Sequence, residues 1–154
     1  MTDYRELNAT LRSLISDIPH LVANLANASA LLYERLDRLN WAGFYLIEDG
    51  KLVLNAFQGK VACIEIPIGR GVCGCAVAER RTLVVPDVHK FPGHIACDGA
   101  SNSEIVIPLF KGEEIFGVLD IDSPIFDRFD DNDKVGLEEF ATILSAELVR
   151  FNLV

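Results

Sequence analysis

The hydrophobic residues of this chain recur at helical spacing, every three or four positions, near both of its ends. Residues 3–18 predict a first helix with the apolar face Leu7, Leu11, Leu14, Ile15 and Ile18, and its start has a capping-box pattern at Asp3 and Glu6. After a break at Pro19, residues 19–39 predict a second helix with the stripe Leu21, Leu25, Ala28, Leu32, Leu36 and Leu39. Residues 131–151 predict a closing helix along Val135, Phe140, Ile143, Leu144 and Leu148.

Between these helices the pattern changes to that of strands. The segments "WAGFYLIE" and "KLVLNAF" flank Asp49-Gly50, a dipeptide that favours a hairpin turn, and "EIVIPLF" and "EIFGVLDID" flank Lys111-Gly112. A short helix is expected in "RGVCGCAVAERR", before the strand "TLVVPD". Because hairpins dominate and no regular strand-helix-strand crossover is found, the sequence predicts an α+β fold with a central antiparallel sheet covered by the terminal helices.

Composition limits the kinds of partner. At 154 residues and 50% hydrophobic, the chain is expected to form a single domain over residues 1–154. Its formal charge is -9, and no Lys/Arg cluster stands out in the sequence, which argues against nucleic acid and anionic membranes as partners. No leader-like start or membrane-length apolar run is found, so we expect a soluble, cytoplasmic protein.

Four cysteines in such a chain belong to a reducing compartment, where a disulfide is usually transient and catalytic. Cys97 lies in the long polar segment "FPGHIACDGASNSE", whose glycines and polar residues, Asp98 among them, leave a thiol accessible and backbone N–H groups free to face an anion. Cys75 is expected to be a small buried hydrophobe, pointing away from Cys73 on the short helix. A structural zinc site is an open alternative, although the C-x-C spacing is unusual and no second pair follows.

Acidic and aromatic residues give further candidates. Asp120 and Asp122 project from the same face of a strand, opposite Leu119 and Ile121; a solvated strand end is the plainer interpretation. Glu104 stands where the long loop enters the next strand, as a binding group or as an ordinary solvated acid. The same-face pair Trp41 and Tyr45 is suited to wall a small ligand, or simply to pack in the core.

Four segments between Asn40 and Pro124 carry a resemblance to a known family: "NWAGFYL", "FQGKVACIEIPIGRGVCGCAV", "VVPDVHKFPGHIACDGASNSEIVIPLF" and "GVLDIDSP". In them the chain resembles the GAF-domain free methionine-(R)-sulfoxide reductases. The matching positions are Cys63, Cys73, Cys97, Glu104, Asp120 and Asp122. The resemblance implies a GAF-like (PAS-like) fold, with which the flanking helices agree.

The resemblance also implies an activity and residue roles. Cys97 would be the nucleophile, Cys63 the main resolving thiol and Cys73 a secondary one. The acids would bind and polarise the sulfoxide, and the aromatic pair would wall the methylthio group. A sulfenic acid on the nucleophile would become an intramolecular disulfide, which a thioredoxin-type dithiol reduces, with neither metal nor cofactor.

Three questions accompany this prediction. The proton for the sulfoxide oxygen is expected on Asp120 or Asp122, because close carboxylates cannot all ionise, while Glu104 pairs with the substrate ammonium. Cys75 departs from the small residue that the family pattern favours, which leaves its part in thiol exchange open. The alternative function is a GAF module that binds a small molecule or senses redox state without catalysis, and a homodimer is expected in either case.

Overall fold

The computed structural model describes residues 1–95, 97 and 99–154. Asp98, expected above in the anion-binding loop, lies outside the described residues. In chain order the elements are α1 (Tyr4–Ile15), α2 (Leu21–Arg35), β1 (Trp41–Glu48), β2 (Lys51–Gly59), β3 (Glu65–Pro67), α3 (Gly71–Glu79), β4 (Leu83–Val85), the 3₁₀ helix η1 (Val88–Lys90), β5 (Ser103–Lys111), β6 (Glu114–Ser123) and α4 (Asp131–Arg150). The predicted helices and hairpins are present, and the short strand β3 adds to them. The first two helices end earlier than predicted, at Ile15 and Arg35, so Ile18, Leu36 and Leu39 follow the helices to whose stripes they were assigned.

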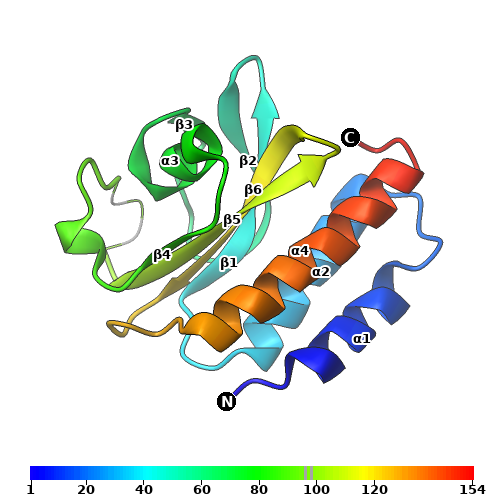
Figure 1. The fold of residues 1–154 in the computed structure, drawn as a ribbon, viewed down its shortest axis with the longest axis horizontal. Helices are drawn as coiled ribbons and strands as arrows, with labels where there is room; N and C mark the ends of the chain where they lie inside the picture. The colour runs from blue at the N-terminus through cyan, green and yellow to red at the C-terminus, as the bar shows by residue number, and fades with distance from the viewer. Residues whose placement is uncertain (96, 98) are drawn as a thin grey trace.

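The described strands form one sheet in the order β3-β2-β1-β6-β5-β4, in which every neighbouring pair runs antiparallel. The predicted hairpins turn at Gly50 and Gly112, whose φ angles of 76° and 61° suit glycine. Figure 1 shows α1, α2 and α4 on one side of the sheet and α3 on the other. The predicted α+β fold with a central antiparallel sheet and flanking terminal helices is confirmed.

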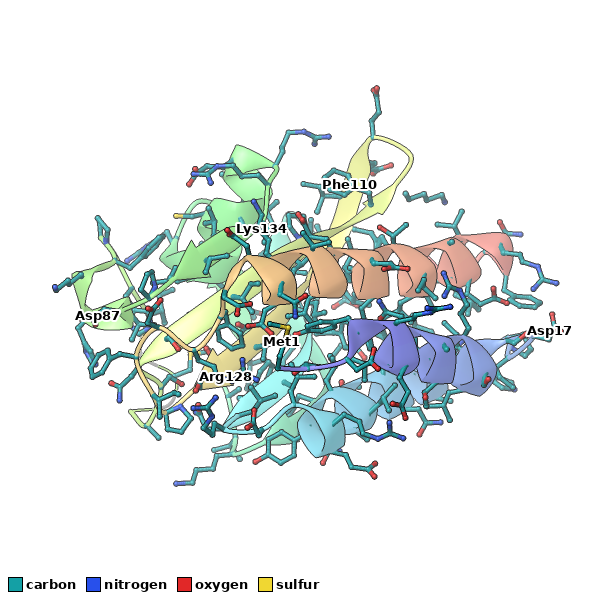
Figure 2. The ribbon with its side chains drawn as sticks, turned by 60° about the horizontal axis from the view of Figure 1, so that its bottom comes forward. Met1, Asp17, Asp87, Phe110, Arg128 and Lys134 are labelled. Atoms are coloured by element: carbon teal, nitrogen blue, oxygen red, sulfur yellow. A yellow bond between two sulfur atoms is a disulfide. The ribbon has the colours of Figure 1, made fainter. Side chains whose placement is uncertain are left out.

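The helices α1, α2 and α4 lie side by side as one layer (Figures 1 and 2). Alternate residues of the central strands are buried beneath this layer: Ala42 and Phe44 from β1, and Leu119 and Ile121 from β6. Among the described residues, no helix has the length and apolar character that crossing a bilayer requires. This face of the sheet is therefore filled by core packing, and the opposite face remains for a site.

Two residues assigned to apolar helix stripes are exposed instead. Leu14 is 39% exposed and Val135 is 67% exposed. On α4 the buried stripe begins at Asp133, Gly136 and Leu137, so Val135 points away from it. On α1 the neighbouring Ile15 takes the buried position.

The side chain of Arg128 joins several elements at one end of the helix layer, where α1 and α4 begin and α2 has ended. Its side chain is 5% exposed and its guanidinium lies 3.2 Å from the carboxylate of Asp133 and 3.2 Å from that of Asp37. The hydroxyl of Tyr4 donates a hydrogen bond of 2.6 Å to the same Asp133. Figure 2 shows Arg128 near the start of α4. The buried Arg128–Asp133 ion pair and the second pair with the exposed Asp37 thus hold together α1, the segment after α2 and α4.

The other face of the sheet is covered by α3. Val72, Cys73 and Ala76 of α3 are buried in a second core with Val106 of β5 and Val118 of β6. The helix lies close to the chain that precedes it, because Gly74 has no side chain and a Cβ there would collide with the carbonyl of Pro67. This close packing places α3 over the polar positions of the central strands.

Candidate active site

A row of functional side chains crosses the central strands on the α3 side. Glu104 on β5 lies opposite Asp122 on β6, and Asp122 lies opposite Trp41 on β1. Asp120, two residues before Asp122, is on the same face of the strand. Glu104 and Asp120 are each only 6% exposed, so the plainer interpretation of solvated acids is wrong for both. The shared face predicted for Asp120 and Asp122 is confirmed, since both line one cavity.

Cys73 lies against these acids from α3. One ligand-type atom from each of Cys73, Glu104 and Asp120 falls in a cluster whose members are all within 4.8 Å of one another. Burial, followed by the charge of Asp120, raises the pKa of the Cys73 thiol well above its usual range. A thiol with a raised pKa is a weak nucleophile at neutral pH, so Cys73 is a poor candidate for the attacking sulfur.

The buried acids also have altered proton affinities. Burial, and then the charges of Asp120 and Asp122, raise the pKa of Glu104 well above its usual range. Burial also raises the pKa of Asp120, although hydrogen bonding with Glu104 and Cys73 acts in the opposite direction. Of these two acids, Glu104 is therefore the one that burial and neighbouring charges favour more strongly in the protonated form. The sequence analysis had paired it with the substrate ammonium instead.

The aromatic pair stacks and also anchors a loop. The ring centroids of Trp41 and Tyr45 are 5.9 Å apart with an interplanar angle of 26°. The indole N–H of Trp41 donates to the carbonyl of Lys60 at 3.2 Å, and the Tyr45 hydroxyl donates to the carbonyl of Cys63 at 2.8 Å. Both rings are buried and line the cavity, so they wall it and at the same time hold the chain that carries Cys63.

The structure contains a disulfide between Cys63 and Cys97, whose Cα atoms are 5.5 Å apart and which are separated by 34 positions in the sequence. This is the pairing that the family resemblance implies for the nucleophile and its main resolving partner. Cys97 also lines the cavity with the acids. The bond therefore joins the long loop before β5 to the loop between β2 and β3 at the edge of the acidic row.

The expectation for Cys75 is wrong. Cys73 is the buried thiol of α3, at 3% exposed, whereas Cys75 is only partly buried and its Sγ lies 3.5 Å from the carbonyl of Gly69. Cys73 and Cys75 do point in different directions, as predicted for positions two apart on a helix. Because α3 is apolar nearly all round, its sequence carries little information on which side faces the sheet.

The site residues enclose a cavity of about 50 Å³. It is lined by Trp41, Tyr45, Val61, Ala62, Ile66, Gly71, Val72, Cys73, His94, Ile95, Cys97, Ser101, Glu104, Asp120 and Asp122. Val61, Ala62 and Ile95 were not among the predicted site residues, although each lies within two positions of Cys63 or Cys97. Burial lowers the pKa of His94, so this ring is neutral at neutral pH and does not balance the acids.

Comparison with known proteins gives a consistent result. A family model of the GAF domain matches residues 23–148. The free methionine-R-sulfoxide reductase of Escherichia coli K12 is 56% identical over 145 residues, covering 94% of this chain and 88% of that protein. The free methionine-R-sulfoxide reductase (fRMsr) of Staphylococcus aureus has been solved in complex with substrate. It is 57% identical with a TM-score of 0.92, and the alignment covers 96% of this chain and 97% of that one.

A second solved structure extends the comparison. The free methionine-R-sulfoxide reductase of Neisseria meningitidis, in complex with its substrate, is 45% identical with a TM-score of 0.94, and the alignment covers 97% of this chain and 90% of that one. The similarity thus includes the helices at both ends as well as the strands that carry the acidic row. This chain belongs to the free methionine-R-sulfoxide reductase family of GAF-domain proteins.

Proposed function

We propose that this chain reduces free methionine-(R)-sulfoxide to methionine, with Cys97 as the nucleophile and Cys63 as its resolving partner. The observation that carries the proposal is the Cys63–Cys97 disulfide at the edge of a cavity lined by buried carboxyl groups. An accessible pair of cysteines supplies two electrons, and a buried carboxylic acid supplies the proton that the sulfoxide oxygen requires. The two solved relatives in complex with substrate have the same fold over nearly their whole length.

The chemistry runs in two steps. The Cys97 thiolate attacks the sulfoxide sulfur, the S–O bond breaks, and the oxygen passes with a proton to Cys97 as a sulfenic acid while methionine leaves. The substrate sulfur gains two electrons and the Cys97 sulfur loses two. The Cys63 thiol then attacks the sulfenic acid, water leaves, and the disulfide forms before the sulfenic acid is oxidised further.

Glu104 is the proton donor in this proposal, in place of the aspartates expected from the sequence. It is buried, and its raised pKa keeps the carboxyl group protonated at a higher pH than an exposed glutamate. Asp120 shares the cluster and stabilises the proton. Asp122, the least buried of the acids, is the better candidate to pair with the ammonium group of the free amino acid. A peptide-linked sulfoxide lacks this charge, which explains selectivity for the free form.

The disulfide-bonded state has too little room for substrate. A cavity of 50 Å³ holds roughly three water molecules, less than a whole amino acid. Reduction of the disulfide frees the loop of Cys97 from that of Cys63, and substrate enters the reduced state. A thioredoxin-type dithiol in a reducing cytoplasm is the reductant in this proposal, because its low potential suits a recycled disulfide.

Assembly is also part of the proposal. Residues 1–154 act as one domain, since α1 packs on α4 although it precedes the segment that the family model matches. Val22 on α2 and Val135 on α4 are apolar and exposed on the helix layer, at 60% and 67%. A homodimer through this layer would cover them and leave the site on the opposite face free.

The test is thioredoxin-coupled turnover of free L-methionine-(R)-sulfoxide, with the S epimer and a peptide-linked methionine sulfoxide measured beside it. Turnover of the free R epimer alone is the expected result, with one disulfide per chain found when reductant runs out. If none of the substrates is turned over, the reductase assignment fails and a ligand-binding GAF module becomes the better interpretation.

The Tyr45 hydroxyl gives a separate prediction about the second step. Tyr45→Phe keeps the ring in the cavity wall but removes the hydrogen bond to the Cys63 carbonyl. A buried hydrogen bond is worth about 0.5–1.5 kcal/mol, so disulfide formation should slow about 2- to 10-fold. Rapid mixing of reduced enzyme with substrate, followed by acid quench and thiol counting, measures this rate. Methionine release in the first turnover should not change.

The matched control is Tyr33→Phe, which alters a tyrosine on the exposed surface of α2. Equal slowing of methionine release and disulfide formation in Tyr45→Phe would show that the hydroxyl serves substrate binding and not the position of Cys63.

A further inference from the structure

The cluster of Cys73, Glu104 and Asp120 contains the donor set of a metal site. It offers one sulfur and two carboxylate oxygens, all within 4.8 Å of one another and all buried. The Oδ1 atom of Asp120 is buried and has no hydrogen-bond partner among the described residues, and the groups with which this carboxylate does hydrogen bond, Glu104 and Cys73, are the other members of the cluster. A buried carboxylate oxygen without a partner is costly, because its lost hydration is not replaced. This oxygen therefore points to a ligand that the cluster is able to accept.

We propose that the reduced protein binds Zn²⁺ or a similar thiophilic divalent cation through Cys73, Glu104 and Asp120, and that the bound cation blocks the substrate cavity. Zn²⁺ prefers thiolate, imidazole and carboxylate ligands. With Zn–S near 2.3 Å and Zn–O about 2.0–2.2 Å, its tetrahedral ligands stand about 3–4 Å apart, so small side-chain rotations bring the cluster to that geometry.

The charge around the cluster favours a cation. Asp122 lines the same cavity, and none of the described residues that line it is a lysine or an arginine. Glu104 and Asp120 are both 6% exposed, so their carboxyl groups face the cavity with little water to screen them. A divalent cation bound there would be held by these oxygens and by the Cys73 sulfur, and the ligands would lose their protons to solvent on binding.

The redox state of the neighbouring pair sets the strength of binding. Cys97 lines the cavity beside the cluster, but in the disulfide-bonded state its sulfur is joined to Cys63. Reduction leaves a free Cys97 thiol on the wall of the same cavity, outside the three-residue cluster, where it can turn toward the cation and supply a second sulfur as fourth ligand. Cation binding is therefore tighter in the reduced form. The resulting inhibition rests on the proposed function, whereas the binding itself does not.

Binding is tested with Co²⁺, whose thiolate complexes absorb strongly through sulfur-to-cobalt charge transfer. The protein is reduced with a phosphine, because dithiols bind the metal themselves. One Co²⁺ per reduced chain is expected to give this band, and Zn²⁺ should displace it. Cys73→Ser should weaken binding by about 100-fold or more, since loss of a supporting group outside the ligand sphere already costs about 10–100-fold.

The matched control is Cys75→Ser, which removes the neighbouring thiol of α3 outside the cluster and should leave the affinity for Co²⁺ unchanged. Glu104→Gln is a second cluster variant and should also weaken binding. Circular dichroism of each variant confirms that it is folded. The proposal is overturned if the reduced protein gives no band, or if Cys73→Ser and Cys75→Ser bind Co²⁺ equally.

Inhibition is tested separately, by Zn²⁺ titration of turnover at several sulfoxide concentrations. Competition with the sulfoxide and full reversal by a chelator are expected. Inhibition that does not depend on sulfoxide concentration would contradict the shared cavity. If turnover itself is absent, the proposed function fails while the Co²⁺ measurement still decides the metal site.

Discussion

Replacement of Cys97 by serine is expected to lower turnover of free methionine-(R)-sulfoxide by about 10³-fold or more, because a serine hydroxyl cannot take the place of an attacking thiolate. The remaining thiols cannot substitute for it easily. Cys63 is on a different loop, between β2 and β3, and Cys73 is buried with a raised pKa. The loss should appear already in the first turnover, when no reductant is needed.

Cys63→Ser is expected to behave differently. Its first turnover should release about one methionine per chain at an unchanged rate, because Cys97 still attacks the sulfoxide. Steady-state turnover should then fall, since the sulfenic acid on Cys97 has lost its resolving thiol. Cys73 offers only slow rescue, because its thiol is buried and protonated.

Rapid-quench measurement of methionine, with a sulfenic-acid trap and mass spectrometry, separates the two variants. The trap should label Cys97 in Cys63→Ser and should label nothing in Cys97→Ser. Cys75→Ser is the matched control and should resemble the unmodified protein, since Cys75 does not line the cavity. A full first turnover in Cys97→Ser together with none in Cys63→Ser would reverse the roles proposed here.

The alternation of apolar and acidic residues along β6 predicts correctly that Asp120 and Asp122 share a face opposite Leu119 and Ile121. Successive side chains of a strand point to opposite faces, so this direction follows from the sequence alone. The pairing of Glu104 with Asp122 does not follow from that pattern. It depends on the register of β5 and β6, which the hairpin sets with a shift between Leu109 and Phe110. The protonation of Glu104 in turn depends on this register and on the helix above it.

The position of α3 is the second feature that the sequence leaves open. Its apolar residues lie on all sides, so the helix has no marked apolar face and its sequence does not say whether Cys73 or Cys75 is buried. Packing of α3 against the sheet determines which of the two thiols is buried, and it buries Cys73 over Asp120. The exposed Leu14 and Val135 have a related cause, since helical spacing predicts a stripe but not where its edge falls.

Glu104→Gln is expected to lower kcat/KM by about 10²- to 10⁴-fold, which is the usual contribution of a general acid. The amide keeps the size of the side chain and still donates a hydrogen bond, but it cannot transfer a proton. In the unmodified protein, activity should also fall as pH rises through the raised pKa of Glu104, because only the protonated acid serves the sulfoxide oxygen. Glu104→Gln should lose this alkaline limb. An unchanged pH profile would place the donor elsewhere, with Asp120 the next candidate.

The same substitution should act on stability in the opposite direction. A glutamate whose pKa is higher in the folded than in the unfolded state, where it is about 4.3, stabilises the fold fully at low pH and loses this contribution as pH rises through the folded value. Glu104→Gln removes the loss, so its urea midpoint should rise relative to that of the unmodified protein from about pH 4.3 up to the folded pKa of Glu104, and the difference should stay constant above it. Glu114→Gln, at an exposed glutamate of β6, is the matched control and should show no such difference. A variant that is less active but no more stable at high pH would mean that Glu104 is ionised in the folded protein, and would remove it as the proton donor.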